Sequence, residues 1–327
     1  MPRITSKKKK LRHVFGPVPS RRLGRSLGVD LIPFKTCSYN CIYCQLGHTT
    51  NHTVERKDYV LVSEVLSEIK SRLQEGPRPD YITLSGSGEP TLHSGIREVI
   101  AGIKSLTDIP VAVLTNGSLL YIPEVSDAII HADLIVPSLD AGDEANFQYV
   151  NRPHSDIGFT DMVDGLVSFR KKFHGQIWLE VFLLGGVTGM ESEAKKIARI
   201  AERMEPDRIQ LNTLTRPATE DYVHAVPKES MEQLAELFIP RAEVIADYRG
   251  VHQEKEFAAR RDDVLDMLAR RPCSLDDIVQ GLGIHKNEAV KYIEELLASS
   301  SIVQELRGSV LYYKVASNTA HLPGEKR

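Results

Sequence analysis

Three of the four cysteines in the chain lie within eight residues, in the segment CSYNCIYC at positions 37–44. Thiolates at this C-x3-C-x2-C spacing can bind one metal centre together, because thiolate is a preferred ligand of zinc, copper(I) and iron–sulfur clusters. A structural zinc site takes four protein ligands. The fourth would be a nearby histidine such as His48, since Cys273 is more than two hundred residues away. A four-iron cluster on three cysteines keeps one iron open to another ligand.

The cysteine segment, C-x3-C-x-aromatic-C in a loop after an early strand, resembles the cluster loop of the radical S-adenosylmethionine (radical SAM) superfamily. The resemblance implies that Cys37, Cys41 and Cys44 hold a [4Fe–4S] cluster, whose open iron binds the amino and carboxylate groups of SAM. It also implies that Tyr43 lies against the adenine. In that family one electron splits SAM into methionine and a 5′-deoxyadenosyl radical, which takes a hydrogen atom from the substrate. A disulfide or a zinc knuckle is the alternative interpretation of these cysteines.

Composition and length describe an ordinary globular chain. Its 327 residues exceed the usual single core, which predicts one large domain and a small appendage. The net charge of −3 argues against binding nucleic acid through global charge. Cysteine usage fits a reducing compartment, and no apolar run for a signal peptide or membrane span follows the basic segment 7–12. We therefore expect a cytoplasmic protein with no membrane partner and a solvated basic tail.

The segment before the cysteine loop contains both turn-forming residues and arginines. Residues 14–28 are rich in glycine and proline, which mark turns and loops. Arg21, Arg22 and Arg25 lie in this segment, and they either hold a phosphate or carboxylate or belong to a solvated loop. An apolar strand from Leu27 to Ile32 then leads into the cysteine loop.

Downstream of that loop, apolar runs alternate with amphipathic segments. The pattern predicts strands at 81–85, 111–115, 134–139, 177–184 and 208–214, and helices at 63–73 (capped by Ser63), 96–103, 123–131, 162–169, 197–204 and 228–238. With the first strand, this makes six right-handed βα units and a parallel sheet. Six units are too few for a closed eight-stranded barrel. We therefore expect an α/β protein with an open, partial (βα)6 TIM-like barrel, the fold that the resemblance also implies.

Ligands of such barrels lie at the C-terminal ends of the strands. The segments SGSGEPT, TNG and SLDA follow the second, third and fourth strands and are similar to the SAM-binding segments of the superfamily. The resemblance implies SAM contacts for six residues: Gly86, Gly88, Glu89, Asn116, Ser138 and Asp140. Each segment also has a structural interpretation: a tight turn at the glycines, a left-handed turn residue at Asn116, and a helix cap at Asp140.

The last two strands add further candidates. Glu180 lies inside an apolar strand, and a buried carboxylate is normally paired. We therefore expect it to face the barrel interior and to contact an arginine, a lysine or the substrate. The resemblance places Asn212 and Leu214 at the level of the adenine. Arg152 and Arg216 precede prolines at the rim, where they either hold an anionic substrate or are solvated.

From residue 260 onward the sequence predicts three short helices and a hairpin over 302–315, which resembles a winged helix-turn-helix. Ser274 is expected to cap the second helix, and Cys273 to be a small buried residue rather than a ligand. The third helix has two lysines, Lys286 and Lys291, against three glutamates, and phosphate binding depends on clustered Lys and Arg. We expect a module that contacts protein or RNA, with DNA less favoured. The predicted divisions are a tail (1–13), the barrel (14–250), a linker (251–258), the winged helix (259–318) and a second tail (319–327).

The strings SGSGEPTLH, SLDAGDE, NRPH and LNTLTRP resemble iron–sulfur oxidoreductases likened to the enzymes that make the wyosine base of tRNA. Those enzymes carry a second cluster on three further cysteines and use pyruvate. This chain has no cysteines left for that cluster, so the resemblance does not extend to wyosine formation itself.

Two reactions stay open: modification of an RNA base and activation of a partner protein by glycyl-radical formation. Either needs an electron donor such as flavodoxin or ferredoxin. The rival class is a non-catalytic regulator, in which the winged helix reads DNA and the cluster senses redox state. The SAM-type segments weigh against a regulator, because a sensor needs no SAM pocket.

Overall fold

The computed structural model describes residues 13–20, 22–215, 218–246, 261–282, 284, 286–308 and 310–316. Its main sheet is built from eight strands: β1 (Val14–Ser20), β2 (Gly24–Val29), β5 (Tyr81–Leu84), β6 (Val111–Thr115), β7 (Leu134–Pro137), β8 (Gln176–Phe182), β9 (Arg208–Asn212) and β10 (Glu243–Val244). The strand order is β1-β2-β5-β6-β7-β8-β9-β10. Each pair from β2 to β10 is parallel, and β1 is antiparallel to β2. The predicted α/β class with a mostly parallel sheet is confirmed.

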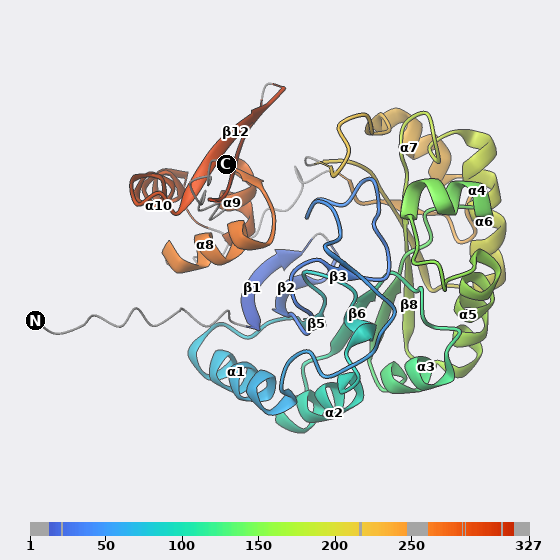
Figure 1. Ribbon diagram of the computed structural model, residues 1–327, viewed down its shortest axis with the longest axis horizontal. Coiled ribbons are helices and arrows are strands. Elements are labelled where there is room, and N and C mark those ends of the chain that lie inside the picture. Colours follow the sequence, from blue (N-terminus) through green and yellow to red (C-terminus); the bar gives the residue numbers. More distant parts are fainter. Residues whose placement is uncertain are drawn as a thin grey trace, which may run out of the picture.

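Helices connect these strands and lie along the outer face of the curved sheet (Figure 1). They are α1 (Val62–Glu75), α2 (Ile96–Leu106), α3 (Pro123–Ile129), α5 (Phe159–Lys172), α6 (Glu191–Met204) and α7 (Lys228–Ala235). Helix α2 illustrates the packing, because Ile96, Val99, Ile100 and Ile103 recur at helical spacing and are all fully buried. Shorter elements are β3 (Thr36–Cys37), β4 (Asn51–His52), η1 (Pro90–Leu92), α4 (Glu144–Asn146) and the π-helical turn η2 (Phe147–Asn151).

The curved sheet is an open, partial barrel. Strands β1 and β10 stand at the two ends of the strand order, so the sheet has two edges. In a closed barrel the first and last strands would pair, and no edge would remain. The carboxyl ends of the parallel strands carry the loops that the sequence singled out.

Three local expectations were wrong. Residues 14–20 form strand β1, because glycine and proline are tolerated in an edge strand where the register is irregular, here between Phe15 and Val18. The predicted strand from Leu27 to Ile32 ends at Val29. Ser63 is not a cap either, because α1 begins at Val62 and its N-cap residue Leu61 makes no side-chain capping bond.

The C-terminal elements have their own apolar core. They are α8 (Arg261–Arg270), β11 (Cys273–Ser274), α9 (Leu275–Leu282), α10 (Lys286–Ala298), β12 (Ile302–Arg307) and β13 (Val310–Val315), with a sheet in the order β11-β13-β12. The predicted three helices and hairpin are present, and Cys273 is fully buried in this core as expected. Ser274 Oγ accepts a hydrogen bond from the backbone of Asp277 at 3.1 Å, which confirms the predicted cap. That this unit acts as a winged helix stays a prediction.

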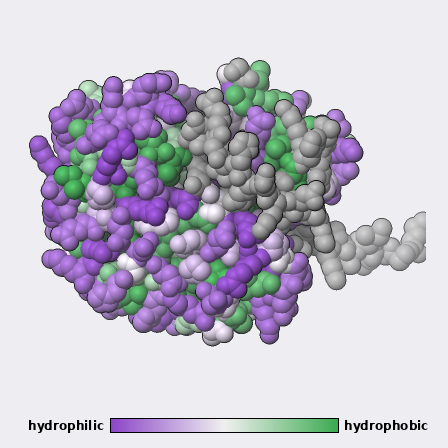
Figure 2. All heavy atoms as spheres, turned by 180° about the vertical axis from the view of Figure 1, so that it is seen from behind, coloured by the Kyte–Doolittle hydropathy of each residue, from purple (hydrophilic) through white to green (hydrophobic). Residues whose placement is uncertain are grey.

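Helices α8 and α9 contact strand β1 (Figure 1), and Val18 of β1 packs against the C-terminal core. Seen from behind, hydrophilic side chains cover most of the coloured surface, with hydrophobic groups scattered among them (Figure 2). Among the described residues, no helix is both long and apolar enough to cross a membrane.

Candidate active site

A cavity of about 510 Å³ lies at the carboxyl ends of the strands and is lined by the cysteine loop, strand β8, the loops after β5, β7 and β9, and parts of β1, β2 and α8. Most of the residues that the sequence singled out line it: Cys37, Tyr43, Cys44, Gly86, Gly88, Ser138, Glu180, Asn212 and Leu214. Segments more than 150 residues apart in the sequence therefore meet at one site.

The cysteine loop is held by short strands and backbone hydrogen bonds. Strand β3, which contains Cys37, pairs with β4. The backbone of Cys44 donates to the carbonyl of Cys41 at 3.2 Å. All four cysteines lie in the described part of the chain, and none of them forms a disulfide there, which gives no support to the disulfide interpretation. Within the described chain, no group of three His, Cys, Asp or Glu side chains could hold a single metal ion. A cluster does not require such a group, because its thiolates bind different irons.

Each cysteine of the loop accepts one hydrogen bond from a side-chain nitrogen. Lys35 Nζ donates to Cys44 Sγ at 3.2 Å. Asn116 Nδ2 lies 3.6 Å from Cys37 Sγ, and Asn151 Nδ2 lies 3.6 Å from Cys41 Sγ. Donors around coordinating sulfurs orient the ligands and tune the centre that they hold.

The protonation of these thiols favours a ligand role. Burial, and after it the nearby Glu89 carboxylate, raise the pKa of the Cys37 thiol to about 12. Burial also raises the pKa of Cys41. Nucleophilic and redox-active cysteines have lowered pKa values, whereas a coordinating metal centre deprotonates a thiol outright. The raised pKa values argue against a nucleophilic role for Cys37 and Cys41, and they are compatible with thiols that ionise when a metal centre binds them.

The glycine-rich loop, residues 85–89, packs directly on the cysteine loop. A Cβ atom on Gly88 would lie 1.8 Å from the carbonyl oxygen of Thr36, the residue before Cys37. Gly86 has a φ of +133°, a backbone conformation that glycine adopts readily and that other residues rarely adopt. The backbone of Lys35 also donates to the Ser87 carbonyl at 2.7 Å. The two glycines allow a contact that no other residue type would permit.

Glu89 is buried and connects two loops through its carboxylate. Its Oε1 accepts hydrogen bonds from Thr91 and Thr115, and its Oε2 accepts from the backbone of Asn116 at 2.7 Å. Burial raises the pKa of this carboxyl, although the hydrogen bonds lower it. Glu89 and Asn116 are not among the residues that line the cavity. Their predicted direct contacts with SAM stay predictions.

Tyr43 and Asp140 join the cysteine loop to strand β8. The Tyr43 ring stacks on Phe182, with ring centroids 4.1 Å apart, and its hydroxyl donates to Asp140 Oδ2. Asn151 Nδ2 donates to the same oxygen at 2.8 Å, and the backbone of Phe182 donates to Oδ1 at 3.0 Å. Asp140 is buried behind Tyr43 and is not a cavity-lining residue. Ser138 lines the cavity, and the predicted SAM contact of Asp140 stays a prediction.

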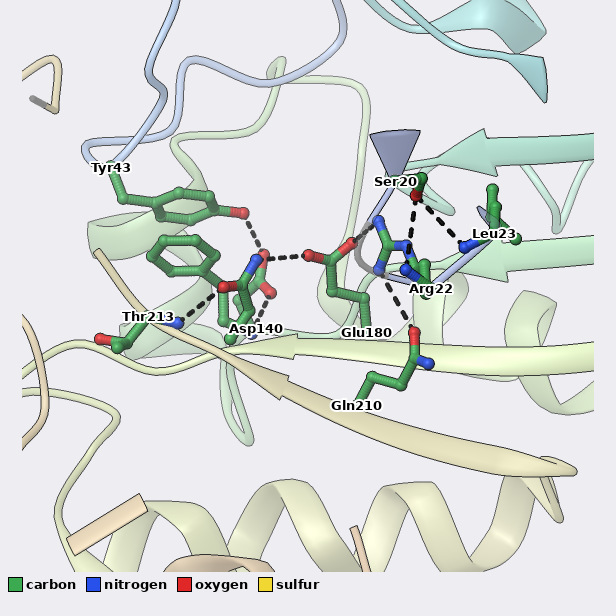
Figure 3. A network of polar contacts seen from close by, with 10 residues as sticks. Ser20, Arg22, Leu23, Tyr43, Asp140, Glu180, Gln210 and Thr213 are labelled. Carbon is green, nitrogen blue, oxygen red and sulfur yellow. Dashed lines mark hydrogen bonds and ion pairs between the residues drawn. The ribbon is translucent and has the colours of Figure 1, made fainter. Parts of the chain in front are cut away.

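Glu180 points into the barrel and pairs with an arginine, as expected (Figure 3). Its Oε2 accepts from Arg22 Nη2 at 2.8 Å, and its Oε1 accepts from Asn212 Nδ2 at 2.9 Å. Arg22 also donates to Gln210 Oε1 at 3.4 Å. Both charged groups are largely buried, and a buried ion pair needs such additional hydrogen bonds. The pair forms a polar wall of the cavity.

Of the two predicted rim arginines, the structure describes Arg152, which is not brought to this cavity. Arg152 donates to Glu220 Oε1 at 2.5 Å and to Tyr222 Oη at 3.0 Å, and it does not line the cavity. Arg216 lies outside the described residues. Of the arginines before the cysteine loop, Arg22 lines the cavity, whereas Arg25 pairs with Asp80 at 3.7 Å.

Sequence reasoning missed several residues of the site. Phe182 follows directly from strand alternation, two positions after Glu180. Asn151 belongs to the NRPH segment, and Lys35 lies two residues before Cys37. Their closeness to these motifs is a signal that would predict both as residues of the site. No sequence signal pointed to Asp30, which accepts hydrogen bonds from Ser87.

Comparison with known proteins agrees with this geometry. A family model, described as the radical SAM superfamily, matches residues 31–200. The chain is 39% identical over 314 residues to a protein of Brachyspira hyodysenteriae called GTPase Obg, a match over 95% of this chain but 46% of that protein. It is 30% identical to the UPF0026 protein MJ1312 of Methanocaldococcus jannaschii, over 92% of this chain and 95% of that protein.

Among solved structures, Streptococcus suis SuiB bound to S-adenosylmethionine is similar, with a TM-score of 0.51 and 12% identity over 73% of this chain and 54% of that chain. At this identity the likeness is one of fold. The family match covers more than half of the chain, and it includes the cysteine loop and the glycine-rich loop. The chain belongs to the radical SAM superfamily.

Proposed function

We propose that this enzyme holds a [4Fe–4S] cluster on Cys37, Cys41 and Cys44 and binds SAM in the adjoining cavity. The observation that carries the proposal is the cavity itself, where the cysteine loop, the glycine-rich loop and the polar ends of β7 to β9 meet. When bound and reduced by a donor such as flavodoxin or ferredoxin, these cofactors supply a 5′-deoxyadenosyl radical that abstracts hydrogen from a substrate.

The residues present fit the cluster. The donor set is three half-buried thiols, the ligand type that iron–sulfur clusters take. One side-chain N–H from Lys35, Asn116 or Asn151 faces each sulfur. Gly88 leaves room for the backbone of the glycine-rich loop to close over the cysteine loop.

The residues also fit SAM. A cavity of about 510 Å³ is within the usual size of small-molecule sites. The stacked rings of Tyr43 and Phe182 offer an aromatic surface for the adenine. Ser138 and Asn212 bring a hydroxyl and an amide to the same cavity. We propose that Glu89 and Asp140 act indirectly, by ordering the loops that contact SAM.

The substrate would share this cavity with SAM, and an RNA base or a glycine of a partner protein are the two classes that we propose to test. Features of the hairpin β12–β13 make DNA less favoured. Arg307 and Lys314 both pair with Glu305, while Leu306 and Val310 are exposed. Among the described hairpin residues, these two basic side chains are therefore paired with a carboxylate and do not form a cluster that could bind phosphate. Cysteines without disulfides also fit the reducing cytoplasm, where we propose that the enzyme acts.

The decisive experiment is cleavage of SAM. Protein reconstituted anaerobically with iron and sulfide is reduced and mixed with SAM, and 5′-deoxyadenosine is measured by mass spectrometry. We expect the parent protein to form it and Cys41→Ala to form none. Cys273→Ala is the matched control, because Cys273 lies in the C-terminal core and its loss should leave cleavage intact.

A reduced cluster that never cleaves SAM, with or without RNA and protein substrates, would count against the enzyme. The next assay would then measure binding of the reconstituted protein to DNA in both redox states. Equal loss of cleavage in Cys273→Ala and Cys41→Ala would show that the assay reports folding rather than ligation.

A further inference from the structure

Lys35 is a buried lysine in an unusual conformation, two residues before the first cysteine. Its exposed fraction is 3%, and lysine is almost never fully buried unless its charge is paired. Its φ is +58°, in the left-handed region that glycine, Asn and Asp adopt more readily. Both features cost free energy, so this position requires an explanation that involves the side chain.

The ammonium group of Lys35 is directed at a cysteine. Its Nζ lies 3.2 Å from Cys44 Sγ, and within the described chain it forms no ion pair with a carboxylate. The donors to the other two cysteines, Asn116 and Asn151, are neutral amides at the longer distance of 3.6 Å. Lys35 is thus the charged member of the three side chains that donate to the cysteine loop.

We propose that Lys35 is a positioning residue that holds a fixed positive charge against Cys44 and thereby raises the reduction potential of the cluster. This inference rests on the proposed function, because it requires a cluster on the three cysteines. Reduction adds one negative charge to the cluster, so a nearby cation stabilises the reduced state more than the oxidised state. Hydrogen bonds to the sulfurs and net charge are established determinants of cluster potential.

The backbone around Lys35 fixes the direction of that charge. The backbone N–H of Lys35 donates to Ser87, and its carbonyl accepts from Thr50 and Asn51 at 3.1 and 3.0 Å. These bonds tie the residue to the glycine-rich loop on one side and to the start of β4 on the other. The left-handed turn is therefore held from both sides, and the side chain is directed toward Cys44.

The experiment measures the midpoint potential of the reconstituted cluster by an anaerobic redox titration that is followed by electron paramagnetic resonance. Lys35→Met removes the charge, Lys35→Gln keeps a donor without the charge, and Lys35→Arg keeps the charge. Lys195→Met is the control, because Lys195 is an exposed lysine paired with Glu191 on helix α6.

We expect Lys35→Met and Lys35→Gln to shift the equilibrium toward the oxidised cluster by about tenfold, which is ~59 mV more negative for a one-electron couple. Lys35→Arg should recover most of the potential, and Lys195→Met should match the parent. Equal potentials in the parent and both neutral variants would overturn the inference.

The amount of cluster that each variant assembles distinguishes the remaining outcomes. Failure of the parent itself to assemble a cluster would refute the proposed function. If the neutral variants lose the cluster while Lys35→Arg keeps it, the charge serves cluster assembly rather than the potential, and the inference is wrong. If all three variants lose it, the lysine serves the fold of the loop, and the inference is wrong.

Discussion

At the scale of single residues, the buried carboxylate of Asp140 orders side chains around the cavity through hydrogen bonds. Asp140 accepts three hydrogen bonds, from Tyr43, Asn151 and the backbone of Phe182. It therefore fixes an aromatic ring that lines the cavity and an amide that faces Cys41. Its contribution to folding depends on which protonation state these neighbours favour.

Asp140 should make stability depend on pH. Burial raises its pKa to about 6, although the hydrogen bonds from Tyr43 and Asn151 lower it. The unfolded value is about 3.9, so the folded state binds this proton more tightly. That contribution to stability is present below about pH 4 and is lost as the pH rises through about 6. The free energy of unfolding of the parent, relative to Asp140→Asn, should fall by about 2–3 kcal/mol across this window.

Urea unfolding of both proteins at several pH values between these limits checks the prediction. Taking the difference between them cancels the groups that titrate in the same way in both. A difference that stays constant would show that folding leaves the pKa of Asp140 unchanged, and a difference that grows with pH would show that folding lowers it.

At the scale of elements, the site depends on the contact between the cysteine loop and the glycine-rich loop. Gly88→Ala should break this contact, because the new Cβ would lie 1.8 Å from the backbone oxygen of Thr36. Such overpacking costs roughly 1–3 kcal/mol. We expect a lower melting temperature and a lower iron content after reconstitution. Gly76→Ala at the end of α1 is the control, since its φ is −126° and its nearest contact is 3.4 Å.

Normal iron loading in Gly88→Ala would mean that the two loops can separate without loss of the cluster. Equal losses in both variants would mean that the effect does not come from the contact with Thr36. A selective loss in Gly88→Ala would link the packing of the two loops to cofactor binding.

The sequence predicted those elements whose pattern is local. Alternation of apolar strands and amphipathic helices located the parallel strands, and the glycine and cysteine motifs located the two loops. Strand β1 was missed because its Gly16 and Pro17 are typical of loops, and only pairing with β2 makes them part of a sheet. The partner of Glu180 could not be identified from sequence, because Arg22 lies 158 residues away and the pair forms only in the folded barrel.

At the scale of the whole molecule, the C-terminal elements are joined to the glycine-rich loop through one carboxylate. Arg270, the last residue of α8, donates to Asp30 Oδ2 at 3.2 Å, and its guanidinium lies 3.3 Å from the ring centroid of Phe15. Asp30 also accepts hydrogen bonds from the backbone and hydroxyl of Ser87 at 3.3 and 2.5 Å. Met267 and Arg270 of α8 line the same cavity as the cysteine loop.

This connection predicts that the C-terminal elements influence SAM binding. Arg270→Met removes the ion pair with Asp30, so the hydrogen bonds between Asp30 and Ser87 are less well fixed. We therefore expect SAM to bind about tenfold more weakly, which is a loss of ~1.4 kcal/mol in binding free energy. Arg307→Gln is the matched control, because Arg307 pairs across the same two parts of the chain with the exposed Asp221, and exposed pairs contribute little. Calorimetric titration of SAM into each reconstituted variant measures the affinities.

Linkage gives the same prediction in the opposite direction. If Arg270 couples α8 to the SAM site, then bound SAM must stabilise the docked position of α8 by the same free energy. Amide hydrogen exchange in residues 261–270 should therefore slow when SAM is added to the parent protein, and it should not change in Arg270→Met. Equal SAM affinity in the parent, Arg270→Met and Arg307→Gln would leave the C-terminal elements as a separate module, whose contact with the barrel serves only to hold the two parts together.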